Sequence, residues 1–335
     1  MSTGKVAPAR PVLKDAVAVS AGKFYCLALK SDGSVVRWMG NDRSQASFEN
    51  VTMTADDGTG SGDPILMQKT KTITNGLVKI NGQAMHDVIS VAAGGGAGEG
   101  FSLALKSDGT VVNWGENSMP TWLSNVVAIA AAGFEGFVVK SDGTVVQWTG
   151  EKLMPESRVL HWVPELSNVV AVAVAENDQG TRKVALLRDG TVVNWRRGIY
   201  YAHETPPFGL SNVVSIAAGS YHTLAVKQDG TVVGWGFNDV GQATGVATTN
   251  SPYTSSGVVR IGGEILSNVV SVAANHNYSM ALKRDGTIVA WGRMEYRLHP
   301  TIVPAGLSNV VAIAAGDNFC LAITTNDVVA EKFRQ

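Results

Sequence analysis

The sequence predicts an all-β protein, a seven-bladed β-propeller, on three observations. One phrase, clearest at 210–236, recurs along almost the whole chain of 335 residues. Each copy holds three short apolar runs of strand length, separated by turn residues. Seven copies occur at a spacing of about forty residues, which favours a propeller of four-stranded blades over a solenoid.

The phrase itself specifies the strands of one blade. Its first strand is expected over 213–217 and its second over 224–226. The second strand leads into Asp229-Gly230, a dipeptide that supplies the positive φ angles of a tight hairpin turn. The third strand begins at Val232 and closes with Trp235. The variable stretch before the next copy has room for a fourth strand, so each copy predicts an antiparallel sheet.

The copies divide one domain, 1–335, into seven units, with a long insertion at 41–86 that suggests an extended hairpin or arm. They lie at 15–40, 87–115, 123–148, 166–195, 210–236 and 266–292 and from 307 to the end. The last copy stops without the Trp-Gly pair. Residues 8–13 resemble the segment that precedes the other copies. We therefore expect this N-terminal strand to complete the last blade and to close the ring, which removes a free sheet edge.

Composition limits the partners and the compartment. The formal net charge is −1, so the chain lacks the basic surface that nucleic-acid binding requires. No stretch reaches the length of a membrane span, and Met1–Pro11 lacks a signal-peptide segment. The sequence predicts a soluble monomer, cytoplasmic or exported by a route without a signal peptide. Cys26 and Cys320 occupy one repeat position and are expected to be free and buried.

The copies share a consensus pattern that resembles repeats of the regulator of chromosome condensation (RCC1) family. The pattern is S-N-V-V-x-I-A-A-G-x-x-H-x-L-A-L-K-x-D-G-x-V-V-x-W-G. In its short blades and short Asp-Gly turns, the sequence looks most similar to bacterial members such as the propeller-type β-lactamase inhibitory proteins. The resemblance implies a propeller. It leaves function open among guanine-nucleotide exchange on a small GTPase, chromatin binding, ubiquitin-ligase modules, ultraviolet sensing and inhibition of an enzyme by capping.

The two faces of the predicted disc differ. The Asp-Gly and Leu-Ser-Asn turns lie on one face and are nearly identical from blade to blade. The turns after Ala-Ala-Gly and the connections after Trp-Gly lie on the other and vary. Aromatic residues among polar groups favour a protein interface there. The candidate contact residues are Phe24, Tyr25, Phe134, Trp162, Tyr200, Tyr201, Tyr221, Phe237, Asn275, Tyr278, Tyr296 and Phe319.

Six tryptophans recur at one position of the repeat, which indicates packing between blades rather than binding. They are Trp38, Trp114, Trp148, Trp195, Trp235 and Trp291. His222 occupies an inner turn, where a structural hydrogen bond is the expected role.

The sequence gives little support for enzyme chemistry, a metal or a cofactor. No histidine has the spacing of a metal ligand pair. The glycine run at 94–100 lacks the Gly-Lys-Ser/Thr ending of a phosphate loop. The acidic segment at 56–63 resembles a calcium loop, but Gln68 stands where the bidentate Glu should be.

The predicted function is therefore a non-enzymatic, protein-binding propeller that engages its partner through the variable face, as an inhibitor or a bacterial effector. A guanine-nucleotide exchange factor-like regulator of a small GTPase is the first alternative. A carbohydrate-binding lectin is the second, although a lectin should repeat one pocket around the ring and these inner turns differ.

Overall fold

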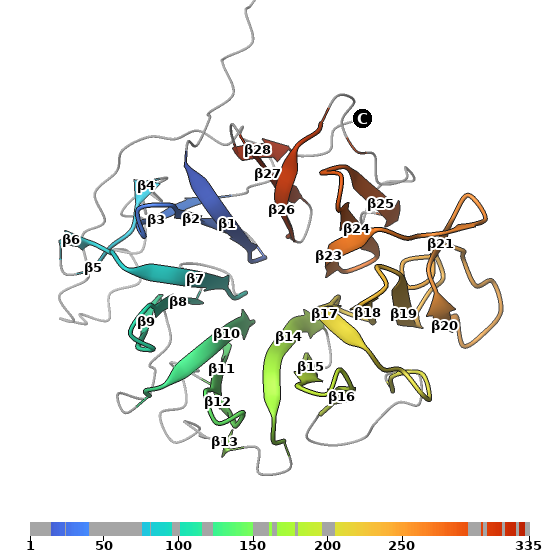
Figure 1. Cartoon of the computed structure of the whole chain (residues 1–335), viewed down its shortest axis with the longest axis horizontal. Coiled ribbons are helices and arrows are strands. Elements are labelled where there is room, and N and C mark those ends of the chain that lie inside the picture. The colour runs from blue at the N-terminus through green and yellow to red at the C-terminus, as the bar shows by residue number, and fades with distance from the viewer. Residues whose placement is uncertain are drawn as a thin grey trace, which may run out of the picture.

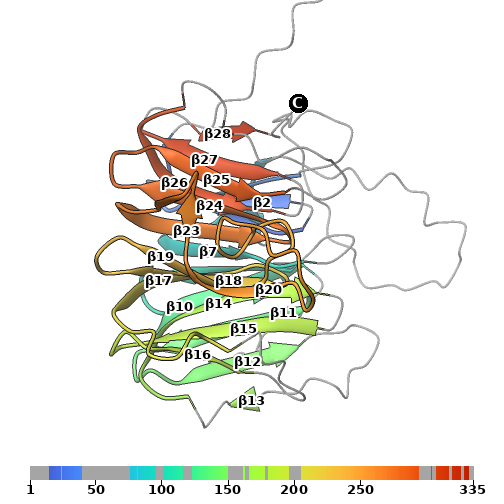
Figure 2. The ribbon, with the colours of Figure 1, turned by 90° about the vertical axis from the view of Figure 1, so that its right-hand side faces the viewer.

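The computed structural model describes residues 15–23, 25–39, 76–80, 82–95, 101–115, 123–149, 161–162, 166–177, 180–195, 205–293, 303, 307–316, 319–325 and 328–331. Every regular element in these residues is a β-strand, which confirms the all-β class. The described strands form seven sheets of three or four strands and two two-stranded hairpins. The sheets surround a common centre (Figure 1), and their strands run between the two faces of the disc (Figure 2). This arrangement is a β-propeller.

The first four sheets follow one another in chain order, each an antiparallel meander. The first contains β1 (Ala16–Ala21), β2 (Tyr25–Lys30), β3 (Val35–Met39) and β4 (Gly76–Leu77). The second contains β7 (Val88–Ala93), β8 (Phe101–Lys106) and β9 (Val111–Gly115). The third contains β10 (Val126–Ala132), β11 (Glu135–Lys140), β12 (Val145–Thr149) and β13 (His161–Trp162). The fourth contains β14 (Val169–Asn177), β15 (Gly180–Leu187) and β16 (Val192–Asn194).

The remaining three sheets repeat this order. The fifth contains β17 (Val213–Ala218), β18 (His222–Lys227), β19 (Val232–Phe237) and β20 (Thr254–Val258). The sixth contains β23 (Val269–Asn275), β24 (Tyr278–Lys283) and β25 (Ile288–Gly292). The seventh contains β26 (Val310–Ala315), β27 (Cys320–Thr324) and β28 (Val328–Glu331). The two hairpins pair β5 (Lys79–Ile80) with β6 (Gln83–Ala84) and β21 (Arg260–Ile261) with β22 (Glu264–Ile265).

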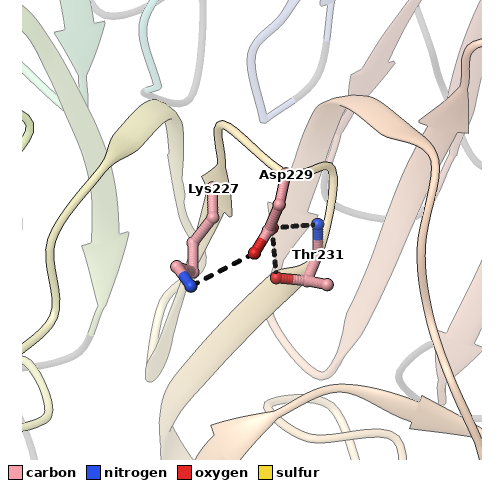
Figure 3. A network of polar contacts seen from close by, with 3 residues as sticks. All are labelled: Lys227, Asp229 and Thr231. Carbon is pink, nitrogen blue, oxygen red and sulfur yellow. Dashed lines mark hydrogen bonds and ion pairs between the residues drawn. The ribbon is translucent and has the colours of Figure 1, made fainter.

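The Asp-Gly turns join β2 to β3 and their equivalents, and each is closed by its own side chains. In the fifth sheet, Asp229 Oδ1 accepts hydrogen bonds from the Thr231 backbone N–H (2.9 Å) and hydroxyl (2.6 Å). Lys227 Nζ lies 3.3 Å from Asp229 Oδ2, and Figure 3 shows how these three side chains meet. These partners, the Thr231 hydroxyl first, lower the pKa of the Asp229 carboxyl to about 2. The turn is thus a local structure that its own sequence specifies.

Each Asp-Gly turn also holds the start of the next sheet. Gly143 has φ +80° and its carbonyl accepts the Val169 N–H at 3.0 Å. The residue before Val169, Asn168, has φ +59°. The same carbonyl contact recurs at Gly33, Gly109, Gly190, Gly230 and Gly286. These contacts place the Asp-Gly turns and the turns before the first strands on one face, as the sequence predicts.

The core lies between neighbouring sheets. Trp148, Trp195, Trp235 and Trp291 are buried, which confirms their structural role. Trp148 meets Phe101 of the preceding sheet edge-on, with ring centroids 6.1 Å apart. Trp114 is half-buried, and the Trp38 side chain lies outside the described residues.

The first and last sheets are neighbours as well. Cys26 and Ala28 of the first sheet pack with Ala314, Phe319 and Leu321 of the last. Both cysteines are free and buried, as expected. The predicted closing strand at 8–13 lies outside the described residues.

The insertion at 41–86 is described only from residue 76, apart from residue 81. There it supplies the fourth strand of the first sheet and the hairpin β5–β6. The fifth sheet has an equivalent strand and hairpin, β20 and β21–β22. Val78 and Val259 are buried at corresponding positions, so the outer hairpin recurs in these two sheets. Residues 41–75 of the predicted arm lie outside the described residues. The acidic segment at 56–63 lies outside the described residues.

The turn contact predicts an unequal response of two glycines to substitution. A Cβ at Gly143 would meet the Asn168 backbone at 2.7 Å, whereas Gly262, also at positive φ, has open space around it. Gly262→Ala should cost about 1 kcal/mol of unfolding free energy from backbone strain alone. Gly143→Ala should cost about 2 to 4 kcal/mol, because the next sheet must shift as well. Urea denaturation of both variants measures this difference, and equal losses would contradict the proposed contact.

Candidate protein-interaction site

The inner turns of the sheets meet around a central cavity of about 380 Å³ on the variable face. Small residues at the ends of the first strands form its wall, among them Ala93, Gly94, Ala131 and Ala218. Their small side chains leave the centre open. Polar and charged lining residues come from different sheets: Lys23, Glu176, Asn177, Ser220, Tyr221, Asn275 and His276.

The fourth sheet makes this cavity asymmetric. Its first strand, β14, has nine residues, whereas the other six first strands have six or seven. Here Ala173-Val174-Ala175 replaces Ala-Ala-Gly, and pairing with β15 continues to Asn177 and Gly180. The extra length carries two polar side chains, Glu176 and Asn177, into the central cavity.

Glu176 and Asn177 reach different neighbours. A Cβ at Gly95 would lie 2.6 Å from Glu176 Oε2, so the carboxylate lies over the inner turn of the second sheet. Gly133 of the third sheet is also next to this side chain. Asn177 Nδ2 donates to the Ser220 carbonyl of the fifth sheet at 2.9 Å. The β14–β15 hairpin thus places one carboxylate in a cavity wall otherwise made largely of small residues.

A row of aromatic rings leads from the cavity toward the outer connections. His276 and Tyr221 line the cavity, with ring centroids 6.5 Å apart. Tyr221 lies 6.3 Å from Phe237, and Phe237 lies 6.4 Å from Tyr253, which is 43% exposed. We call these four residues the aromatic row. It provides a partly exposed apolar surface bordered by the polar cavity, the composition that protein interfaces favour.

A buried hydrogen-bond network begins at His222, the residue that follows Tyr221 of the aromatic row. His222 is fully buried, and its Nε2 lies 2.8 Å from Ser279 Oγ. Ser279 Oγ donates its proton to the Gln242 carbonyl at 2.8 Å, so His222 Nε2 must be the donor to Ser279. Trp291 Nε1 donates to the same carbonyl. This network ties the connection after the fifth sheet to the sixth and confirms the structural role expected for His222.

Asn238 organises the rest of that connection. It is fully buried; its Oδ1 accepts the backbone N–H groups of Ala243 and Thr244, and its Nδ2 donates to the Val246 carbonyl at 2.7 Å. The loop is therefore held in one conformation before any partner arrives. Preorganisation of this kind lowers the entropy that binding costs.

Three of the predicted contact residues are wrong, because their side chains are buried. The Tyr25 hydroxyl donates to the Phe101 carbonyl and bonds Ser102 of the next sheet. The Tyr278 hydroxyl donates its one proton to the Gly316 carbonyl and lies 2.9 Å from the Phe319 carbonyl of the last sheet. Phe319 is 9% exposed and packs in the core between the first and last sheets. All three connect neighbouring sheets.

The other predictions divide into two groups. Tyr221 and Asn275 lie at the cavity, Phe237 lies in the aromatic row, and Phe134 is half-buried in the inner turn of the third sheet. Beyond the described residues lie Phe24, Tyr200, Tyr201, Tyr296 and the Trp162 side chain. Glu176 and His276 at the cavity and Tyr253 in the aromatic row were not among the candidates. Each occupies a segment where the copies differ, and this signal could have identified them.

In the part of the chain that the structure describes, no three His, Cys, Asp or Glu side chains gather as metal ligands would. Nor does that part contain a helix able to cross a membrane. Of the glycine run at 94–100, the structure describes Gly94 and Gly95, which line the cavity.

These features define a repeat-built β-propeller with one uniform structural face and one variable face suited to binding. Residues 213–242 match the model of the regulator of chromosome condensation (RCC1) repeat. Protein pim1 of Schizosaccharomyces pombe is 24% identical over 193 residues, which cover 54% of this chain and 30% of pim1. The guanine nucleotide exchange factor SRM1 of Saccharomyces cerevisiae is 33% identical over 91 residues, which cover 27% of this chain and 18% of SRM1.

The crystal structure of Prp20p from Saccharomyces cerevisiae is similar in fold. It has a TM-score of 0.54 and 21% identity, and the match covers 74% of this chain and 77% of Prp20p. The chain spans less than a third of the length of pim1 and SRM1. Residues 213–242 thus match an RCC1 repeat, and the likeness to Prp20p supports the propeller fold. The narrower likeness to bacterial inhibitory proteins stays a prediction.

The buried His222 predicts a pH dependence of stability. Burial, with Arg182 nearby, lowers its pKa from 6.5 to about 3. Between these values the unfolded chain binds a proton that the folded chain does not, so stability is lost as the pH falls. The loss should reach roughly 3 kcal/mol by pH 4.

His222→Gln, which keeps a hydrogen-bond donor near Ser279, should remove this pH-dependent loss of stability. The measurement is the free energy of unfolding from pH 7 to pH 4 for both proteins. The wild type should lose more stability than the variant over this interval. Parallel curves would contradict a neutral, buried His222.

Proposed function

We propose that this chain is a protein-binding propeller that regulates a small GTPase in the manner of a guanine-nucleotide exchange factor. The observation that carries the proposal is the variable face, where, among the described residues, an aromatic row and the carboxylate of Glu176 border one cavity. The likeness to SRM1, which is named an exchange factor, supports this function over inhibition. Prp20p has a similar fold, and its crystal structure was described together with its binding properties to Gsp1p and histones.

Nucleotide exchange requires that the exchange factor bind the two states of the GTPase with different affinities. A protein that binds the nucleotide-free GTPase more tightly than the loaded one lowers the affinity for nucleotide by the same factor. A rigid face is suited to this task, because it does not adapt equally well to both states of its partner. The Asn238 loop provides such rigidity on this side of the disc.

The aromatic row is the proposed hydrophobic anchor. Tyr221 lies at its centre, between Phe237 and His276. Glu176 supplies a negative charge across the cavity, which favours a cationic group on the partner. Both act through contact alone, so no covalent chemistry is required of this chain.

The test is release of labelled GDP from Gsp1p, the binding protein named for Prp20p. The wild-type chain should accelerate release. Tyr221→Ala should reduce the acceleration roughly tenfold or more, as for an aromatic anchor. Val127→Thr, on the opposite face, is the matched control and should leave the rate unchanged.

Other results of this assay have clear meanings. Binding of Gsp1p without accelerated release would overturn exchange and favour a capping inhibitor. No binding at all would exclude Gsp1p as the partner. A rate that Tyr221→Ala leaves intact would contradict the assignment of the face.

We also propose that the full chain forms seven blades and that residues 8–13 complete the last sheet as its fourth strand. The contact of the first sheet with the last supports this closure. Deletion of residues 1–13 should expose the edge of the last sheet and lower the melting temperature, as scanning calorimetry can measure. A melting temperature equal to that of the full chain would contradict closure by this segment.

A further inference from the structure

The uniform face carries an apolar feature that the proposed function does not use. Every first strand begins with a β-bulge, where the register with the second strand skips one residue. In the third sheet Val126 pairs with Lys140 and Ala128 pairs with Val139, so Val127 has no partner residue. The skipped residue is β-branched and apolar in all seven sheets. We call these residues the apolar ring: Val17, Ile89, Val127, Val170, Val214, Val270 and Val311.

All seven side chains of the apolar ring are exposed, by 38% to 56%. Each directly follows the first residue of its strand, on the face that holds the Asp-Gly turns. The first strands contact one another in sequence around the disc, and β1 contacts β26. They surround the centre in Figure 1. The seven side chains therefore form a recurring pattern around one face rather than scattered exposures.

Strand propensity alone does not require this pattern. Threonine has a strand propensity similar to that of valine and is polar. The bulge releases the position from core packing. The residue after it is Ala or Ser in every copy, for example Ala128 and Ser215. Repeated exposure of Val or Ile at a free position, rimmed by polar groups, is typical of an interaction surface.

The rim around the apolar ring carries a Lys–Asp ion pair in the turns of four sheets, the first, third, fifth and sixth. Lys30–Asp32, Lys140–Asp142, Lys227–Asp229 and Lys283–Asp285 are ion pairs of 3.3 to 4.0 Å. Figure 3 shows the third of these. A rim of alternating charges does not attract nucleic acid or an anionic membrane, which require an excess of positive charge. It does complement a second rim of the same kind.

We propose that two copies of this chain stack face to face through the apolar ring. An isologous interface requires the same self-complementary patch on both subunits. The apolar ring supplies an apolar core and the turns supply a charged rim, the usual anatomy of an interface. This dimer differs from the monomer that the sequence predicts. It leaves the variable face free for the proposed partner.

Departures from the repeat specify how the copies align. Asp15 and Asp87 flank the turn of the first sheet, where other copies have Asn. The turn of the sixth sheet carries two positive charges, Lys283 and Arg284, whereas the turn of the fourth sheet has Arg188 but Leu187 in place of the lysine. The side chains of Asp15, Asp87 and Arg284 are exposed. Stacking with the first sheet of one copy over the sixth of the other brings these opposite charges together twice, by symmetry.

The experiment is sedimentation velocity of the full chain over a wide range of protein concentration, since dimerisation depends on concentration. The wild type should shift from monomer to dimer. The triple variant Val127→Thr, Val214→Thr and Val270→Thr keeps side-chain shape and strand propensity, and its dissociation constant should rise at least tenfold. Val246→Thr, 58% exposed but outside the apolar ring, is the matched control and should dimerise as the wild type does.

The alignment has its own test. Arg284→Asp should weaken the dimer by placing like charges together, and Asp87→Arg in the same chain should restore it. Failure of the double variant to restore the dimer would overturn this alignment. A wild type that stays monomeric, or a triple variant that dimerises as tightly, would overturn the interface. Circular dichroism melting of each variant verifies the fold, and GDP release from Gsp1p, measured separately, reports on the variable face alone.

Discussion

The fold depends on one recurring contact, the hydrogen bond from the first strand of each sheet to the glycine carbonyl of the preceding Asp-Gly turn. Gly143 and Val169 are one example. The glycine must have positive φ for the turn and must lack a Cβ for the close approach of the next chain segment. Because both requirements fall on one residue, turn formation and sheet-to-sheet spacing are coupled. The same contact in successive sheets produces the curvature of the disc.

This coupling separates the two faces of the molecule. The turns on the Asp-Gly face must keep the backbone geometry of this contact, so their sequence hardly changes from copy to copy. The opposite face carries no such requirement, and its turns and connections differ. The extension of β14 illustrates the consequence, since a first strand of nine residues, against six or seven in the other sheets, changes the cavity while the Val169 contact to Gly143 is kept. Scaffold and binding surface can therefore vary independently.

The candidate site was predictable in position but only partly in its residues. Tyr221 and Tyr278 both follow inner turns, and both looked suitable for contact. Tyr221 lies beside the cavity, whereas the Tyr278 hydroxyl reaches two carbonyls of the last sheet and is buried. A difference of one residue in position decides which way the side chain points, because successive side chains along a strand point to opposite faces of the sheet. Glu176 was missed because only the strand extension brings it to the centre.

The sequence by itself determined the all-β class, the strand order within each sheet and the turn positions. These depend on short-range causes: apolar runs of strand length, and the φ angles that Gly, Asn and Asp tolerate. Only the tertiary structure decided which aromatic side chains are buried, how Glu176, Tyr221 and His276 meet at one cavity, and that seven bulges leave β-branched residues exposed. Those outcomes depend on contacts between sheets that are distant in the chain, and local pattern does not encode such distances.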